Sequence, residues 1–298
     1  MTFQILLQTL LNSLMYMSIL SLSSFAIILI FRTSTTTNFA QGTISVFGAY
    51  IVAYLFTMNH VNVFVGLAIG TVASFLLGFL IDTQIFRRSR HLTGIGKQMI
   101  TMGLVLFISG LIPVIFGTNP VMIPYLIPVT KSVNFTLFGA SYTLNGHALL
   151  TTILAIVILT TAFIALKYTK WGLGVRATAS SEKVAGMMGV NTRMITAISW
   201  SLAGFIGGLA AILYAGTIGS VEQSLMTNVQ VNGFLANILG GFGTFYGPIV
   251  GSVLITFFGN TIGYFNSVWK DVIVYGLILV VLLVRPFGIF GKKTIKKV

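Results

Sequence analysis

Ion-coupled transport and acid–base catalysis both need carboxylates, and this sequence holds only four: Asp82, Glu182, Glu222 and Asp271. Each of them falls in a predicted loop or at the end of an apolar segment. Carriers driven by protons or sodium usually place ionisable groups within their membrane spans. Backbone carbonyls alone can bind sodium, so the pattern disfavours ion coupling without excluding it. The energy for active transport is then expected to come from another subunit.

The sequence also has few residues that could bind a metal or act as a nucleophile. The three histidines, His60, His91 and His147, lack the spacing of a metal or haem site, and the chain has no cysteine. The sequence contains no phosphate-binding loop of the Gly-x-x-x-x-Gly-Lys-Ser/Thr type. We therefore expect a non-enzyme without metal or cofactor, in which the histidines are interfacial or loop residues. If ATP is the fuel, a partner must hydrolyse it.

A short polar segment is the first candidate for a substrate pathway. It consists of Asn38, Phe39, Gln41 and Gly42 around Ala40, between two apolar segments. Amides beside a glycine at membrane depth suit a broken helix, because irregular backbone is tolerated there only away from lipid. Interrupted helices of transporters often hold the substrate. A plain cytoplasmic turn explains the same residues equally well.

Glycines mark a second candidate further along the chain. Gly240, Gly241 and Gly243 are assigned to the substrate pathway together with the polar segment. Gly243, Gly247 and Gly251 recur at every fourth residue, which places them on one face if the run is helical and permits close helix packing. Tight packing at a turn between two spans is the interpretation that these glycines favour.

The loop of residues 167–193 is the third candidate, and we call it the coupling loop. A serine hydroxyl followed by Glu182 can cap a short helix, which Gly189 can end. Exposed apolar side chains on such a helix usually mark a contact surface, and methionine adapts well to one. Those side chains are Val184, Met187 and Met188. An amphipathic turn held on lipid headgroups by Lys183 is the alternative.

Membrane helices are the elements that position these segments. Of the 298 residues, 56% are hydrophobic and 7% charged, with a mean hydropathy of +0.98, which does not suit a water-soluble protein. A membrane helix needs about 20 mostly apolar residues. We predict one all-α domain over residues 1–298, a polytopic bundle of eight to ten spans with interrupted helices and nine as the best count. The predicted spans are residues 5–31, 43–57, 61–81, 99–116, 147–166, 194–215, 229–246, 247–265 and 268–284.

The basic residues predict the orientation of this bundle. The chain carries 17 Lys and Arg and a net charge of +13, but these residues fall in short stretches between apolar spans, which argues against nucleic acid. Nine crossings with an external N-terminus and a cytoplasmic C-terminus leave only Lys131 and Lys270 outside. Residues 285–298 then form a basic cytoplasmic tail. The loop 117–146 becomes external, as either a connector or a contact for a partner.

Several segments carry a family resemblance. They are Asn-Phe-Ala-Gln-Gly with a later Gly-Ala-Tyr, Arg-Ala followed by Met-Gly-Val-Asn in the coupling loop, Leu-Gly-Gly-Phe-Gly, and Lys-Asp ahead of Arg-Pro-Phe-Gly-Ile-Phe-Gly. In this order, over nearly the whole chain, they resemble the permease family of branched-chain amino acid ABC importers, specifically the shorter of its two permease types. Gln41 stands where the family often has His, and Thr244 where it usually has Ser. These departures leave the substrate open.

The resemblance implies a heteromeric importer in the cell membrane. This permease would stand beside a second, related permease, two cytoplasmic ABC ATPases and an extracytoplasmic substrate-binding protein, and would move branched-chain or other hydrophobic amino acids by alternating access. The ATPases would press on the coupling loop. Its expected contact residues are Arg176, Glu182, Lys183, Val184, Ala185, Met187, Met188 and Gly189. The alternative function is a self-sufficient channel or facilitator for a small polar solute such as an amide or urea.

Overall fold

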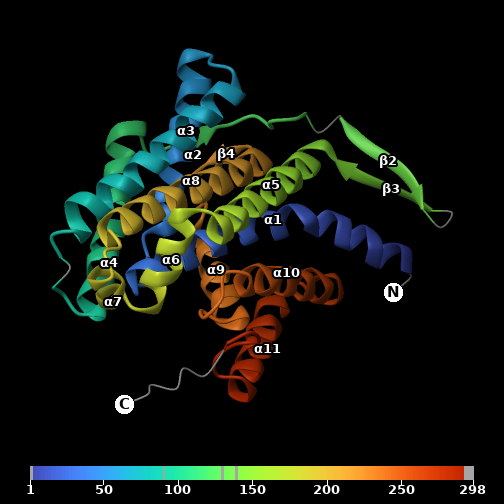
Figure 1. The fold of residues 1–298 in the computed structure, drawn as a ribbon. Coiled ribbons are helices and arrows are strands. Elements are labelled where there is room, and N and C mark those ends of the chain that lie inside the picture. The colour runs from blue at the N-terminus through green and yellow to red at the C-terminus, as the bar shows by residue number, and fades with distance from the viewer. Residues whose placement is uncertain (1–2, 90, 129–130, 138–139, 292–298) are drawn as a thin grey trace.

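The computed structural model describes residues 3–89, 91–128, 131–137 and 140–291, and it shows a bundle of helices (Figure 1). Seven helices of this described part are long and apolar enough to cross a membrane, which confirms the predicted all-α polytopic fold. They are α1 (Phe3–Ser34), α2 (Gln41–Asn59), α3 (Val63–Leu80) with its π-helical continuation (Ile81–Phe86), α4 (Gly94–Phe116), α5 (Gly146–Tyr168), α8 (Thr192–Ile218) and α10 (Gly247–Phe265).

The other two predicted spans are shorter helices. Helix α9 (Thr227–Gly240) has 14 residues and α11 (Lys270–Val284) has 15. At 1.5 Å per residue, each measures about 21–23 Å, less than the hydrocarbon thickness of about 30 Å. The predicted span 229–246 is therefore too long at its end, because Gly241 adopts a φ of +96° and stops the helix.

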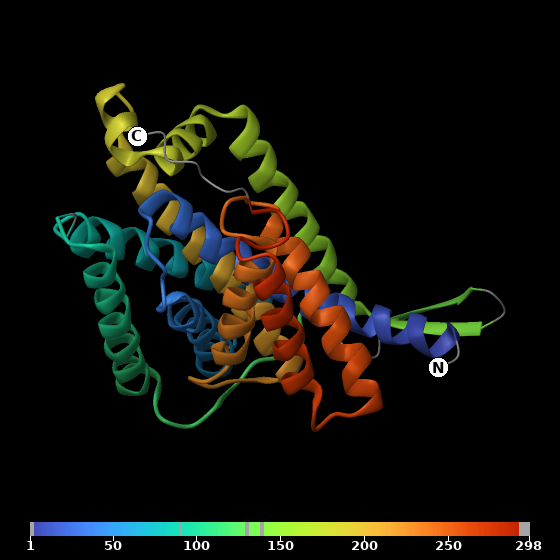
Figure 2. The same cartoon turned by 90° about the horizontal axis from the view of Figure 1, so that it is seen from below.

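Two short helices and four strands connect the long helices. Helices α6 (Lys170–Ser180) and α7 (Glu182–Met187) lie between α5 and α8. Strands β1 (Val121–Met122) and β4 (Ser220–Val221) pair antiparallel, as do β2 (Ser132–Leu137) and β3 (Ala140–Asn145). Figures 1 and 2 show the β2–β3 hairpin projecting from the bundle beside the start of α1. The loop 117–146 therefore carries structure of its own.

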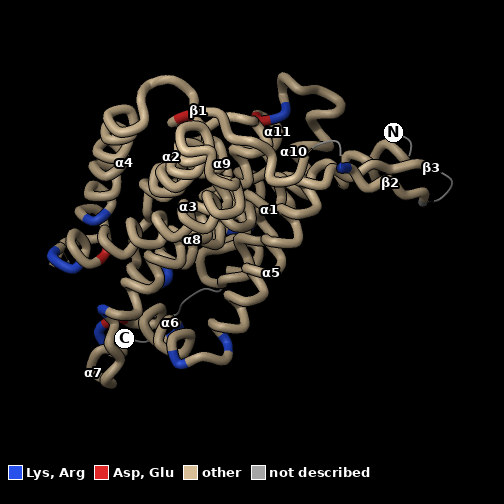
Figure 3. Tube along the Cα trace, turned by 90° about the horizontal axis from the view of Figure 1, so that it is seen from above, with Lys and Arg blue, Asp and Glu red and all other residues tan. Residues whose placement is uncertain are grey.

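Positive charge gathers at one end of the molecule. Figure 3 shows most Lys and Arg around α6, α7 and the start of α4, and we call this the basic end. By the positive-inside rule the basic end is predicted to face the cytoplasm, and this orientation stays a prediction. Arg90 and the tail residues 292–298 lie outside the described residues.

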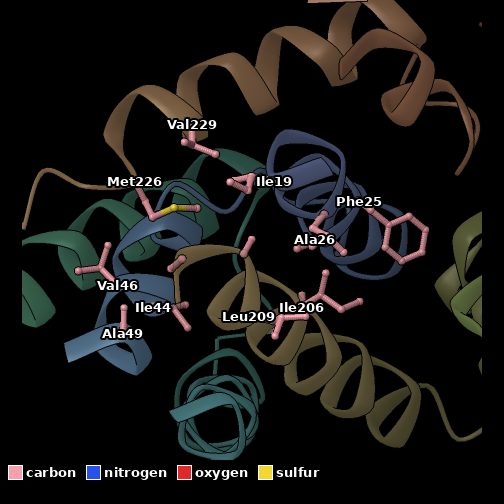
Figure 4. Packing of buried hydrophobic residues seen from close by; sticks show 14 of the residues in the cluster. Ile19, Phe25, Ala26, Ile44, Val46, Ala49, Ile206, Leu209, Met226 and Val229 are labelled. Carbon is pink, nitrogen blue, oxygen red and sulfur yellow. The ribbon is translucent and has the colours of Figure 1, made fainter. Parts of the chain in front are cut away.

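Helix α8 forms the centre of the bundle, packed between α1, α2 and α3. Figure 4 shows Ile206 and Leu209 of α8 close to buried side chains of α1 and α2. Small residues permit this packing: a Cβ atom on Gly204 would overlap the carbonyl oxygen of Ser74, and one on Gly78 would overlap that of Trp200. Such close backbone approach is typical of membrane helices, which gain little from hydrophobic burial against each other.

Replacing the glycine at the α3–α8 contact tests this packing. Gly204→Ala adds a methyl group against the backbone of α3, and we expect it to destabilise the fold by about 1–3 kcal/mol through overpacking. The measurement is the thermal unfolding midpoint of the purified protein in detergent. Gly276→Ala is the matched control, because a Cβ atom there meets nothing within 4 Å. Equal midpoints for both variants would contradict the proposed role of Gly204.

Candidate functional site: a buried polar turn

The polar segment predicted from the sequence forms an irregular turn between α1 and α2. Helix α1 ends at Ser34, α2 begins at Gln41, and Thr35 adopts a positive φ of 50° between them. The turn lies inside the protein, because Asn38 is 0% and Gln41 1% exposed. This burial fits a broken helix that faces other protein segments better than it fits a turn exposed on the cytoplasmic surface.

Two side-chain amides connect the turn to the central helix. The Asn38 Oδ1 accepts a hydrogen bond from the Ala40 N–H at 3.0 Å, and its Nδ2 donates to the Gln41 Oε1 at 3.2 Å. The Gln41 Nε2 in turn donates to the carbonyl oxygen of Ala203 in α8 at 2.9 Å. The turn is therefore held to α8 by neutral hydrogen bonds rather than by charge.

Two further polar residues hold the turn from α9 and α4. The Gln230 Nε2 donates to the Phe39 carbonyl oxygen at 2.6 Å, and its Oε1 accepts from the Gly42 N–H. A Cβ atom on Gly42 would overlap this Oε1, which explains the glycine. The Thr101 Oγ1 accepts from the Phe39 N–H at 3.3 Å. The sequence analysis missed Gln230 and Thr101, whose only signal is a single polar residue in an apolar segment.

The glycine-rich turn lies elsewhere, at the opposite end of α9 from Gln230. Gly240 and Gly241 are buried, and the tail that follows α11 packs on them: the Ile289 N–H donates to the Leu239 carbonyl oxygen at 2.8 Å. The structure does not bring these glycines to the buried polar turn. Gly243 is exposed.

The predicted helix face of glycines needs a correction. Helix α10 begins at Gly247, so Gly243 lies in the preceding turn and does not share a helix face with Gly247 and Gly251. The close packing predicted for the other two is confirmed. A Cβ atom on Gly247 would overlap the carbonyl oxygen of Gly240, and one on Gly251 would overlap that of Ala236, so α10 lies directly against the backbone of α9.

The coupling loop forms the short helix predicted from its sequence. The Ser181 Oγ accepts a hydrogen bond from the Val184 N–H at 3.3 Å at the start of α7, and Gly189 follows the helix with a φ of +84°. Val184, Met187 and Met188 are 51%, 71% and 80% exposed. The basic end therefore presents an apolar surface, which we call the α7 surface and define by these three side chains.

The remaining coupling-loop residues attach this surface to the bundle. Ala185 is buried beneath α7, whereas Lys183 is exposed. The Arg176 guanidinium donates to the carbonyl oxygens of Leu166 and Lys167 at the end of α5, which lack intrahelical partners there. Glu182 lines a small cavity that it shares with Asp82. Ala185 and Glu182 thus face the protein, the exposed Arg176 caps the end of α5, and the α7 surface faces outward.

The structure shows two ionisable residues to be more buried than the sequence indicated. Asp82, predicted in a loop or at the end of an apolar segment, lies in the π-helical continuation of α3, is 4% exposed, and accepts a hydrogen bond from the Thr196 Oγ1 at 3.4 Å. His147, predicted as an interfacial or loop residue, is not in a loop. It lies in the first turn of α5, fully buried, with its Nε2 3.0 Å from the Leu213 carbonyl oxygen. In both cases packing against α8 removes a helix end from solvent.

These features together define a multi-pass protein of the plasma membrane with a broken helix at its centre and an exposed apolar surface at its basic end. The sequence matches the family described as branched-chain amino acid transport system / permease component over residues 9–282. The chain belongs to this family, and it is a transporter component rather than a catalytic enzyme.

Individual relatives cover most of the chain. The high-affinity branched-chain amino acid transport system permease protein LivH of Escherichia coli (strain K12) is 26% identical over 274 residues, which cover 88% of this chain and 87% of LivH. The corresponding protein BraD of Pseudomonas aeruginosa is 24% identical over 310 residues, with 98% of each chain covered. The probable LivH of Methanocaldococcus jannaschii is 23% identical over 296 residues, covering 94% of this chain and 91% of that protein. No solved structure matches the chain.

Removing the Gln230 amide tests the polar turn. Gln230→Leu leaves the Phe39 carbonyl and the Gly42 N–H without their partner, and each unpaired buried group costs about 1–3 kcal/mol. We expect a lower thermal unfolding midpoint in detergent. The matched control is Gln223→Leu, which removes one exposed bond to the Ser109 carbonyl oxygen and is expected to change the midpoint little. A larger effect at Gln223 than at Gln230 would show that the turn does not depend on this amide.

Proposed function

We propose that this chain is the membrane-spanning permease subunit of an ATP-driven importer for branched-chain or other hydrophobic amino acids. The names of LivH and BraD, which align along most of the chain, support the substrate class. The polar turn supports it as well, since its side chains are neutral amides beside an aromatic ring. An apolar amino acid needs no charged residue for its side chain and only hydrogen-bonding groups for its zwitterionic end.

The substrate pathway in this proposal runs past the buried turn. The polar groups of Asn38, Gln41 and Gly42 lie at the N-terminus of α2, which no side chain caps. They are paired within the protein here, so a substrate would bind by exchanging with these partners. Helix N-termini favour carboxylates. Phe39 offers an apolar surface, with its ring 5.4 Å from that of Phe234 in α9. Gly240, Gly241 and Gly243 stay in the proposal as a packing turn at the cytoplasmic end of the same helix α9.

Coupling to ATP hydrolysis would use α8 as a rigid connection. The α7 surface lies directly before α8, which begins at Thr192 and carries Ala203, the hydrogen-bond acceptor of Gln41. Movement of α7 at the basic end can therefore change the position of α8 relative to the turn. This single chain of contacts, from the exposed methionines through one helix to the buried amides, carries the proposal. Alternating access then requires that the ATPases contact α7 differently in their two states.

The partners follow from this mechanism. Two cytoplasmic ABC ATPases would bind the α7 surface of this chain and the equivalent surface of a second, related permease. An extracytoplasmic binding protein would deliver the substrate at the opposite end, where the β2–β3 hairpin projects (Figure 1). The hairpin is held to α1 by the Gln8 Nε2, which donates to the Thr143 carbonyl oxygen at 3.0 Å. That attachment makes it a defined surface rather than a loose connector.

Charge placed on the α7 surface tests the coupling role. In the double variant Met187→Asp and Met188→Asp, two exposed apolar contacts become carboxylates, which are costly to bury in an interface. We expect loss of co-purification with the ATPases and at least a tenfold fall in ATP-dependent amino acid uptake, with membrane insertion unchanged. The measurements are affinity pull-down from solubilised membranes and uptake into vesicles.

Met122→Asp is the matched control, because this methionine is 73% exposed at the opposite end, in β1. It should leave ATPase association intact. Normal association and uptake in the double variant would remove the coupling role from α7. Solute flux through the reconstituted chain alone, without ATP, would instead support a facilitator.

A further inference from the structure

A groove of about 520 Å³ opens between α3 and α4 and belongs to neither the polar turn nor the α7 surface. Leu80, Ile81 and Ile85 line it on the α3 side, and Ile100, Gly103 and Phe107 on the α4 side. Its surface is almost wholly apolar. The groove runs along two membrane-spanning helices, so its walls lie at the depth of lipid acyl chains.

A glycine and a π-helical turn shape this groove. Gly103 is exposed, and a Cβ atom there would meet nothing within 4 Å, so the missing side chain leaves space between the helices. The π-helical segment Ile81–Phe86 widens the end of α3 and contributes Ile81 and Ile85 to the wall. Single π-helical turns inside α-helices are rare and occur frequently at functional sites. The groove is therefore built into the local backbone.

Polar groups occur only toward the basic end of the groove. Gln84 is the polar residue among its lining residues, and it is exposed. Arg87 and Arg88 follow in the turn directly after the π-helical segment that carries Gln84. Arg87 and Arg88 are both exposed, at the level where Figure 3 shows positive charge beside the start of α4. The apolar groove thus ends near two arginine side chains, at the depth expected for the lipid headgroups of the cytoplasmic leaflet.

We propose that this groove is a binding site for an anionic phospholipid, whose acyl chain lies between α3 and α4. The phosphate would interact with Arg88 and Arg87, and Gln84 would donate a hydrogen bond to the glycerol ester. Charge complementarity favours this occupant over a second protein helix, because apolar walls that end in exposed arginines match the two parts of such a lipid. Basic pockets between membrane helices on the cytoplasmic side bind anionic headgroups in this way.

The test is native mass spectrometry of the full chain, purified in detergent and titrated with phosphatidylglycerol or phosphatidylcholine. We expect phosphatidylglycerol to bind more tightly. Arg88→Gln should reduce the affinity for phosphatidylglycerol about fivefold, which is the effect of one basic residue near an anionic headgroup. The affinity for phosphatidylcholine should not change. Gly103→Leu fills the groove and should lower the affinity for both lipids at least fivefold.

Gly110→Leu is the matched control for groove filling. Gly110 is exposed two turns further along α4, outside the lining residues, and a Cβ atom there also meets nothing within 4 Å. It should bind both lipids as the unaltered chain does. Equal binding of the two lipids by the unaltered chain, or equal binding by the two leucine variants, would overturn the proposal. The proposal would also be overturned if Gly103→Leu bound lipid like the unaltered chain but no longer co-purified with a neighbouring permease. That result would assign the groove to a protein interface.

Discussion

The structure depends on one constraint: backbone N–H and C=O groups at membrane depth must find partners within the protein. The chain leaves helical geometry between Ser34 and Gln41, and so frees several of these groups inside the bundle. Gln230 pairs two of them, while Thr101 pairs one. An irregular segment can therefore persist at the centre of a membrane protein.

Close backbone approach between helices is the condition that lets α8 pack at the centre of the bundle. Membrane helices cannot associate by hydrophobic burial alone, so contact between α3 and α8 depends on glycine at Gly78 and Gly204. Helix α8 begins soon after α7, and its Ala203 accepts a hydrogen bond from the polar turn. The coupling that we propose depends on this packing, because packed helices shift as units and not residue by residue.

The charged residues act at the surface and not in the centre. Most of the described Lys and Arg lie at the basic end, which the positive-inside rule predicts to face the cytoplasm. Asp82 is the buried exception, and it lies near the basic end with a threonine hydroxyl as a neighbour. In the function that we propose, a pathway with neutral side chains leaves the energetic coupling to partner subunits.

The sequence alone determined the fold class, most of the spans and the capped helix α7, because each depends on local pattern: apolar length and a serine before an acid. It could not determine which single polar residue within an apolar segment completes a site. Gln230, Thr101 and the buried environment of His147 depend on contacts between residues far apart in the chain. It also placed the end of α9 too late, since the helix stops where Gly241 turns against a tail about 50 residues later. Only the packing of segments far apart in the chain decided these features, because burial and hydrogen-bond partners belong to the assembled bundle.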